Sequence, residues 1–188
     1  MLIIGITGTL GSGKGTVVEF LKEKGFAHFK MSDFIAEEIK KRGMPINRDT
    51  MVEVGNDLRA MHSSGYIAEE LYKRAAAQSK NAVIESLRAV GEIEALKAKG
   101  SFYLFAVDAD PKIRYERIKE RKSEKDNISF EKFLEDEKRE MTSSDPNKQN
   151  ISACMKLADY TFLNNGAKEN LIRQIEKTLA EIAGNTNN

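Results

Sequence analysis

The stretch "GTLGSGKGT", residues 8–16, follows the apolar run "LIIGIT" (2–7) and contains four glycines and one lysine. Gly8, Gly13 and Lys14 have the G-x-x-x-x-G-K spacing of a phosphate-binding loop. In such a loop, glycines let backbone N–H groups turn toward an anion, and the helix that follows adds a favourable dipole. The lysine supplies a positive charge for the β- and γ-phosphates of a nucleotide. Because a buried strand pattern precedes the loop and a helical pattern follows it, we expect a nucleotide cradle rather than an ordinary strand-to-helix turn.

The residue after the lysine departs from the usual motif. Gly15 stands where a Ser or Thr hydroxyl normally contacts Mg²⁺, and Thr16 comes one position later. We therefore expect Thr16 to bind a phosphate near the metal, and the Mg²⁺ to be held by water and a carboxylate. The remaining candidate contacts to the donor nucleotide within this stretch are Gly8, Gly11, Ser12, Gly13, Lys14 and Gly15.

The composition narrows the class of protein. The 188 residues include 30 basic and 29 acidic side chains, a net charge of +1 that argues against a nucleic-acid or membrane-surface partner. The one cysteine, Cys154, cannot form an internal disulfide, and the N-terminal apolar run is too short for a signal peptide. The sequence thus predicts a single cytoplasmic domain over residues 1–188, with Cys154 in a structural role.

Apolar runs alternate with helical periodicities along the chain. The predicted strands are 2–7, 27–31, 81–86, 101–109 and 159–165. The predicted helices are 14–24, 33–42 after a Ser32–Asp33 cap, 51–61, 66–79, 110–122 with an Asp–Pro start, 130–142 and 171–182. This alternation predicts an α/β fold with a parallel sheet covered on both faces, in which ligands bind at the carboxyl ends of the strands.

Four further segments extend a family resemblance over nearly the whole chain: "KMSDFIAEEIK" (30–40), "VIESLR" (83–88), "VDADPKIRYERIKERK" (107–122) and "ADYTFLNNG" (158–166). With the glycine loop, they resemble the adenylate kinase branch of the nucleoside monophosphate kinases. The chain is also similar to small archaeal-type and phage-type nucleotide kinase-like proteins related to dephospho-coenzyme A kinase. In that group the third strand ends in Asp–Gly, where this chain has Glu85–Ser86.

The resemblance implies a three-layer P-loop kinase fold with a five-stranded parallel sheet, ATP and Mg²⁺ as cofactors, and a small nucleotide as substrate. It implies an acceptor-binding helical segment at about 32–80 and a short helical lid at about 117–145, in which "SEKDNIS" (123–129) closes over the site. It also places Arg117 and Arg121 as catalytic lid arginines, with Arg117 on the donor nucleotide, and Asn165 in the loop near the adenine.

Phosphoryl transfer requires cations that converge on the transferred group, because catalysis is mostly positioning and charge neutralisation. Arg88 follows the third strand and is expected to clamp the acceptor phosphate or the transferred group; the alternative is a surface arginine paired with Glu92. Arg139 is a weaker lid candidate for the substrate. Arg114 shares a helical face with Arg117 and Arg121, but its spacing indicates a solvated face.

Three residues admit two interpretations each. Glu85 ends a buried strand, where it would hold Mg²⁺ through water or form a salt bridge with Lys14. Asp33 would cap its helix or contact the acceptor ribose or base. Arg59 would bind the acceptor or lie on a helix surface. For the whole protein, the predicted activity is an ATP-dependent kinase for a nucleoside or deoxynucleoside monophosphate. The alternatives are a dephospho-coenzyme A kinase, or a P-loop ATPase or regulatory nucleotide-binding protein without a small acceptor.

Overall fold

Five short apolar segments form one parallel sheet in the computed structural model, which describes residues 1–121 and 128–185. The strands are β1 (Ile3–Gly8), β2 (Ala27–Lys30), β3 (Ala82–Glu85), β4 (Phe102–Asp108) and β5 (Tyr160–Leu163). Their order across the sheet is β2-β3-β1-β4-β5, and every neighbouring pair is parallel. The predicted α/β fold with a five-stranded parallel sheet is therefore confirmed, with strand ends shifted by one or two residues.

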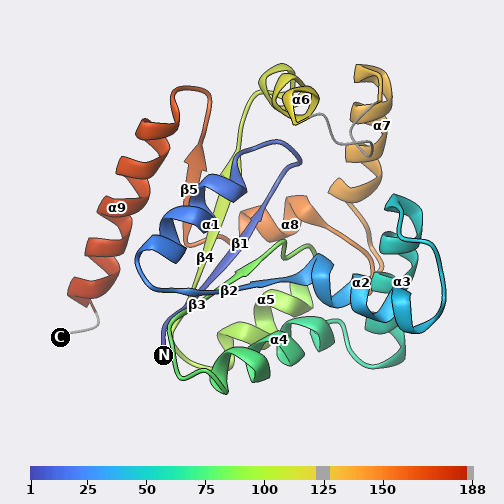
Figure 1. Ribbon diagram of the computed structural model, residues 1–188, viewed down its shortest axis with the longest axis horizontal. Helices are drawn as coiled ribbons and strands as arrows, with labels where there is room; N and C mark the ends of the chain where they lie inside the picture. The colour runs from blue at the N-terminus through green and yellow to red at the C-terminus, as the bar shows by residue number, and fades with distance from the viewer. Residues whose placement is uncertain (122–127, 186–188) are drawn as a thin grey trace.

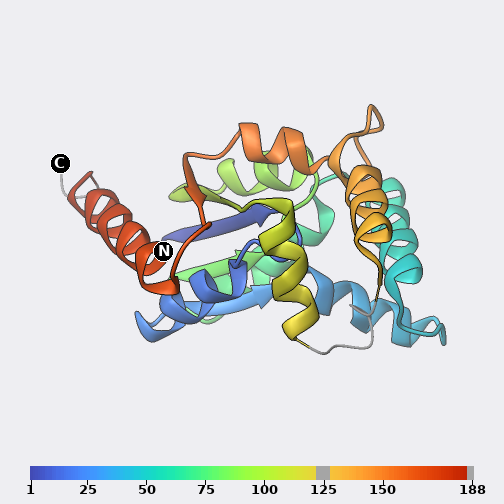
Figure 2. The ribbon, with the colours of Figure 1, turned by 90° about the horizontal axis from the view of Figure 1, so that it is seen from above.

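Helices connect the strands and cover both faces of the sheet (Figures 1 and 2). They are α1 (Lys14–Glu23), α2 (Met31–Lys41), α3 (Arg48–Met61), α4 (Tyr66–Ala76), α5 (Val90–Lys97), α6 (Pro111–Glu120), α7 (Phe130–Met141), α8 (Ile151–Lys156) and α9 (Lys168–Asn185). Asp110 caps α6 by accepting a hydrogen bond from the backbone of Lys112, and Pro111 is the first helical residue, as the sequence predicts. None of the helices in the described residues is both long and apolar enough to cross a membrane.

The two cores follow from the alternation of side chains along the strands. On one face, Ile3 of β1 and Ile84 of β3 pack against the helices α2 to α5 and against Cys154 of α8. On the other face, Ile4 and Ile6 of β1 pack against α1 and α9. Burial raises the pKa of the Cys154 thiol to about 12, so this cysteine remains protonated and is a packing residue.

Two helices are not predicted by the sequence pattern, and α2, α3 and α9 start two or three residues earlier than predicted. Helix α5 buries Glu92 next to Ile93 and Leu96. Because a charged residue lies on its buried face, the sequence does not show the apolar periodicity of an amphipathic helix. Helix α8 has only six residues, too few for a periodic pattern. Helix α2 begins at Met31, so Asp33 lies in its first turn and the predicted Ser32–Asp33 cap is wrong. The chain enters this helix directly from the last residue of β2, without a loop in which a capping side chain would stand.

Candidate active site

The glycine loop between β1 and α1 has the backbone of an anion cradle. Gly8, Gly11 and Gly13 have φ values of 134°, 79° and 103°, a region that residues with a side chain rarely adopt. A Cβ atom at Gly8 would lie 2.0 Å from the carbonyl oxygen of Val107, and one at Gly13 would lie 2.2 Å from Nδ2 of Asn164. The packing against β4 and the loop after β5 thus requires glycine at these two positions.

Ser12 and Asn164 complete the cradle. Asn164 donates a hydrogen bond from Nδ2 to the carbonyl oxygen of Ser12 at 2.8 Å, which ties the loop to the end of β5. The Ser12 hydroxyl is buried and has no hydrogen-bond partner among the described residues. A buried polar group without a partner is costly, so this hydroxyl fits a phosphate oxygen bound in the loop.

Lys14 folds back onto the loop, where its ammonium group donates to the carbonyl oxygens of Gly8 at 3.0 Å and Thr9 at 2.7 Å. Burial lowers the pKa of Lys14 to about 7, and the positive charges of Arg88 and Arg121 add to the effect. The Glu85 carboxylate instead pairs with His28, at 3.0 Å between Oε2 and Nε2. Glu85 had two interpretations, a Mg²⁺ site and a salt bridge with Lys14. Among the described residues, the salt bridge is not formed.

This environment predicts that binding of a nucleoside triphosphate takes up a proton. With a pKa of about 7, Lys14 is mostly neutral in the free protein at pH 8, and phosphates beside it favour the charged form. Calorimetric titration with MgATP in buffers of different ionisation enthalpy should show uptake of about one proton at pH 8 and much less at pH 6. Uptake that does not change between these pH values would contradict the assignment to Lys14.

Glu85 is the last residue of β3 and is 9% exposed. Burial alone would raise the pKa of its carboxyl group. The hydrogen bond from His28 and the positive charges of Lys30 and Lys14 outweigh burial, so this pKa lies below its ordinary value. The carboxylate is therefore negatively charged near neutral pH and available to bind the water shell of a cation.

The next residue, Ser86, has a φ of 73°, in the left-handed region that favours glycine. The backbone N–H groups of Ser86 and Leu87 both donate to the carbonyl oxygen of Ile6 at 3.0 Å, which fixes this turn against β1. Where the resembled kinase-like group has Asp–Gly, this chain thus places a serine in a conformation that suits glycine.

We expect the side chain at position 86 to determine how much this strained turn lowers the free energy of unfolding. Ser86→Gly should unfold at the same urea concentration as the wild type or a higher one, because relief of strain offsets the greater freedom of the unfolded chain. Ser86→Val should lose about 1–2 kcal/mol of unfolding free energy, since a branched side chain fits this region poorly. Equal stability of the two variants in urea unfolding would argue against strain at this residue.

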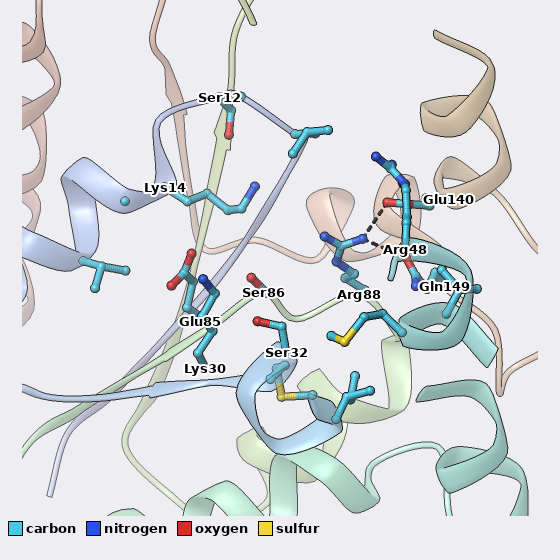
Figure 3. A pocket seen from close by; sticks show the side chains of 18 of the residues that line it. Ser12, Lys14, Lys30, Ser32, Arg48, Glu85, Ser86, Arg88, Glu140 and Gln149 are labelled. Carbon is cyan, nitrogen blue, oxygen red and sulfur yellow. Dashed lines mark hydrogen bonds and ion pairs between the residues drawn. The ribbon is translucent and has the colours of Figure 1, made fainter. Parts of the chain in front are cut away.

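A cavity of about 630 Å³ extends from the glycine loop past the carboxyl end of β3 to helices α2 and α3 (Figure 3). Lys14 and Glu85 lie at one end, together with His28 of β2. Arg88 lines the same cavity, and its Nη1 donates to Glu140 Oε2 at 2.5 Å and to Gln149 Oε1 at 3.0 Å. The cavity therefore brings Lys14 and Arg88 together, as the crevice rule for parallel sheets predicts.

Arg48 is a second arginine at this end, and no sequence pattern singles it out. It lies at the N-terminus of α3 and donates from Nη2 to Glu140 Oε1 at 2.8 Å. Glu140 of α7 is 5% exposed, so one buried carboxylate joins two arginines from different segments. Arg48, Glu140 and Gln149 were all missed as site residues, because they stand in unremarkable charged or polar stretches without a local motif.

Glu92 of α5 organises the segment that carries Arg88. Its Oε2 accepts hydrogen bonds from the backbone N–H groups of Arg88 at 2.8 Å and Ala89 at 3.0 Å. Its Oε1 accepts from Nε and Nη2 of Arg59, at 2.8 and 2.7 Å. Glu92 is fully buried and Arg59 is 3% exposed, so the surface interpretation of Arg59 is wrong. The predicted alternative pair between Arg88 and Glu92 exists only through the Arg88 backbone, since its side chain points to Glu140.

Arg114 of α6 is 3% exposed, and the solvated position expected for it is also wrong. Its Nε donates to the carbonyl oxygen of Ala109 at 2.7 Å, and Nη1 donates to that of Leu10 in the glycine loop at 3.2 Å. It also pairs with Glu137 of α7 at 2.8 Å. Arg114 therefore connects the glycine loop to α7.

Arg117 and Arg121 line a second cavity of about 480 Å³ on the other side of the loop, together with Thr16 and Asn164. Arg121 lines both cavities, so it lies between them. Thr16 lies in the second cavity and Glu85 in the first, so the two predicted metal residues do not share a cavity. Asn165 accepts from the backbone of Asp110 at 2.8 Å, and its neighbours Asn164 and Gly166 line the second cavity.

The structure does not bring every predicted residue to the cavities. Asp33 is exposed, and the preceding residue Ser32 lines the first cavity in its place. Arg139 is half exposed and pairs with Asp49 at 3.4 Å. Neither Asp33 nor Arg139 is among the described residues that line the two cavities. The predicted lid lies partly outside the described residues, since most of 123–129 is not described.

Among the described residues, no group of three or more His, Cys, Asp or Glu side chains is placed to hold a metal ion. Mg²⁺ in phosphoryl-transfer sites is commonly held by one or two carboxylates and by substrate phosphates, rather than by a cage of protein ligands. Glu85, charged and close to the glycine loop, fits that kind of site.

The parallel sheet, the glycine loop after β1 and the cavity beside it define a P-loop kinase-like nucleotide-binding domain. The chain belongs to the AAA domain family, whose model matches residues 4–143, and to the UPF0200 proteins. It is 30% identical to a UPF0200 protein of Methanococcus vannielii over 188 residues, which covers 98% of each chain. It is also 30% identical to the UPF0200 protein MJ1399 of Methanocaldococcus jannaschii over 193 residues, covering 98% of this chain and 92% of that relative.

Solved structures share the fold at low sequence identity. TT1252 from Thermus thermophilus has a TM-score of 0.65 and 21% identity, over 96% of this chain and 97% of that one. Shikimate kinase from Bacteroides thetaiotaomicron has a TM-score of 0.61 and 13% identity, over 95% and 98% of the two chains. A gluconokinase from Sinorhizobium meliloti has a TM-score of 0.61 and 16% identity, over 98% and 95%. These similarities confirm the P-loop kinase fold, whereas the adenylate kinase branch stays a prediction.

Proposed function

We propose that the protein transfers the γ-phosphoryl group of ATP to a small anionic acceptor, a nucleoside or deoxynucleoside monophosphate. The observation that carries this proposal is that one cavity is lined by Lys14 of the glycine loop and by Arg88 after β3. A volume of about 630 Å³ is in the range of small-molecule sites. The donor phosphates at Lys14 and the acceptor phosphate at Arg88 would thus face each other across this cavity.

The charges of the cavity support an anionic pair of ligands. The described residues that line it include six Lys or Arg side chains and three Glu side chains, in a chain with 30 basic and 29 acidic residues overall. The cations come from separate segments: Lys14, Lys30, Arg48, Arg59, Arg88 and Arg121. Arg59 is 3% exposed and pairs with the fully buried Glu92, so it is not open to an incoming anion. The more exposed Arg48 and Arg88, which share Glu140, and Arg121 are the arginines that face the anion.

In the proposed reaction, an acceptor phosphate oxygen forms a bond to the γ-phosphorus, and the bond from that phosphorus to the β,γ-bridging oxygen breaks to release ADP. Mg²⁺ would neutralise charge on the donor phosphates when bound. Lys14 and the loop N–H groups hold the donor phosphates, and Glu85 orients the cation's water shell. Arg88 holds the acceptor by a charge-assisted contact, and Arg117 and Arg121 approach the donor from the second cavity.

A phosphate acceptor requires cations at the far end of the cavity, whereas the 3′-hydroxyl of dephospho-coenzyme A requires room and a hydrogen-bond acceptor. The Arg48–Arg88 pair favours the phosphate.

A labelling experiment distinguishes the alternatives. The protein is incubated with γ-labelled ATP and Mg²⁺ in the presence of each nucleoside monophosphate, each deoxynucleotide and dephospho-coenzyme A. We expect a labelled nucleoside diphosphate. Label only on coenzyme A would favour the dephospho-coenzyme A kinase, and label only in inorganic phosphate would favour an ATPase.

A further inference from the structure

Helix α7 places a carboxylate where the proposed acceptor anion would bind. Its residue Glu140 is 5% exposed and joins Arg48 and Arg88 with one oxygen on each, as Figure 3 shows for Arg88. Gln149 adds a contact to the same guanidinium of Arg88. A carboxylate that bridges two arginines in a cavity matches, in charge and in hydrogen-bond geometry, the phosphate group that such arginines bind.

Glu140 belongs to helix α7, and the other contacts of this helix involve different residues. Figure 2 shows α7 alongside α3, and Glu140 contacts Arg48 of α3 as well as Arg88. One turn away, Glu137 pairs with Arg114, which holds the glycine loop. Buried Phe133 anchors the helix to α6 through its contact with Tyr115. Asp136 of α7 also lies 3.8 Å from Arg48, but of these acids only Glu140 contacts both Arg48 and Arg88, whereas Glu137 contacts Arg114 beside the glycine loop.

We propose that Glu140 is an internal ligand of the acceptor subsite, which an anionic acceptor displaces from Arg48 and Arg88. The proposal rests on the proposed function in one respect, that the acceptor binds at these arginines. While the subsite is empty, Glu140 keeps two clustered positive charges paired. A phosphate carries more charge than a carboxylate and contacts both guanidinium groups, so it competes for them and frees the end of α7.

The exchange makes Glu140 a determinant of specificity. A neutral acceptor has nothing to replace the carboxylate at Arg48 and Arg88, so the arginines stay paired with Glu140 and α7 stays in place. An anionic acceptor binds with an apparent affinity reduced by the fraction of molecules in which Glu140 occupies the arginines. Removal of the charge at position 140 should therefore tighten anion binding rather than weaken it.

Inorganic phosphate tests the proposal without any nucleotide. In the wild-type protein, we expect phosphate to increase hydrogen exchange in α7, and adenosine to leave that exchange unchanged. The phosphate effect should disappear in Arg88→Ala, which separates it from phosphate bound in the glycine loop. An effect that persists in Arg88→Ala would overturn the proposal, and so would its absence in the wild type.

A matched pair of variants supplies the second measurement. Glu140→Gln should bind phosphate about tenfold more tightly than the wild type in calorimetric titration, which corresponds to Glu140 occupying the arginines in ~90% of molecules. Glu137→Gln removes the neighbouring contact of α7 with Arg114 and should change the phosphate Kd by less than about threefold. Weaker phosphate binding in Glu140→Gln would mean that Glu140 positions the arginines instead of competing for them.

The hydrogen-exchange and phosphate-binding measurements do not depend on whether the protein phosphorylates a nucleotide. If no nucleotide becomes phosphorylated but phosphate still displaces Glu140, the proposed function fails and the internal ligand stands. If a monophosphate is phosphorylated and Glu140→Gln leaves its KM unchanged, the proposed function stands and the internal ligand fails.

Discussion

Lys14→Ala should lower kcat/KM for phosphoryl transfer by about 10³-fold, the cost of removing a group that stabilises developing charge in a water-excluded site. Lys14 lies against the carbonyl oxygens of Gly8 and Thr9, so its ammonium group is already held at the loop that would bind the donor. Transfer of label from γ-labelled ATP and calorimetric binding of MgATP measure the effect. We expect the variant to lose both transfer and tight MgATP binding.

Arg88→Ala is the matched comparison, because it removes a cation that lines the same cavity but follows β3 instead of belonging to the glycine loop. It should reduce acceptor-dependent turnover by a similar factor while the Kd for MgATP stays within about twofold of the wild type. Full transfer activity in Lys14→Ala would contradict the assignment of the glycine loop. Loss of MgATP binding in Arg88→Ala would mean that Arg88 contacts the donor nucleotide instead of the acceptor.

The glycine loop and the sheet could be predicted from the sequence because each depends on neighbouring residues. The spacing from Gly8 to Lys14, the apolar run before it and the Asp110–Pro111 start of α6 are local patterns, and local patterns determine strands, loops and caps. The resemblance to nucleotide kinases rests on the same short motifs. The predicted strand limits consequently agree with the structure to within two residues.

The cluster of Arg48, Arg88 and Glu140 could not be predicted in this way, because its contacts join residues far apart in the chain. Arg48 and Glu140 are separated by 92 residues, and Arg88 and Glu140 by 52. In the sequence, each of these residues is one charge among many on an amphipathic helix or in a loop. The partner that makes each one a site residue comes from another element.

Arg114 was expected on a solvated face, and a helix surface was one of the two interpretations of Arg59, for a related reason. An arginine at a helical position is usually exposed, and burial is tolerated only when an acid lies within reach. The acids are Glu92, 33 residues after Arg59, and Glu137, 23 residues after Arg114. Since the tertiary fold sets both distances, the sequence period alone could not distinguish a buried pair from two solvated charges.

Glu92→Ala should destabilise the protein strongly. The carboxylate is fully buried, and its loss leaves the buried charge of Arg59 without its partner. It also removes the acceptor for the backbone N–H groups of Arg88 and Ala89. Breaking a buried ion pair from one side costs about 3–5 kcal/mol. For a chain of this size, that corresponds to a fall in Tm of roughly 10 °C in calorimetry. Glu94→Ala, an exposed change on the same helix, should shift Tm by only about 1–2 °C.

A double-mutant cycle distinguishes the ion pair from the loss of side-chain volume. Glu92→Gln keeps an oxygen for the two backbone N–H groups but removes the negative charge, and Arg59→Met removes the positive charge with little change in volume. The two changes together should cost at least about 1 kcal/mol less than the sum of the single changes, because each single variant leaves one buried charge uncompensated. Additive costs in urea unfolding would mean that the pair contributes packing alone. Because the backbone of Arg88 is bound to Glu92, the cycle also predicts that Glu92→Gln, which keeps this contact, raises the KM of the acceptor less than Glu92→Ala does.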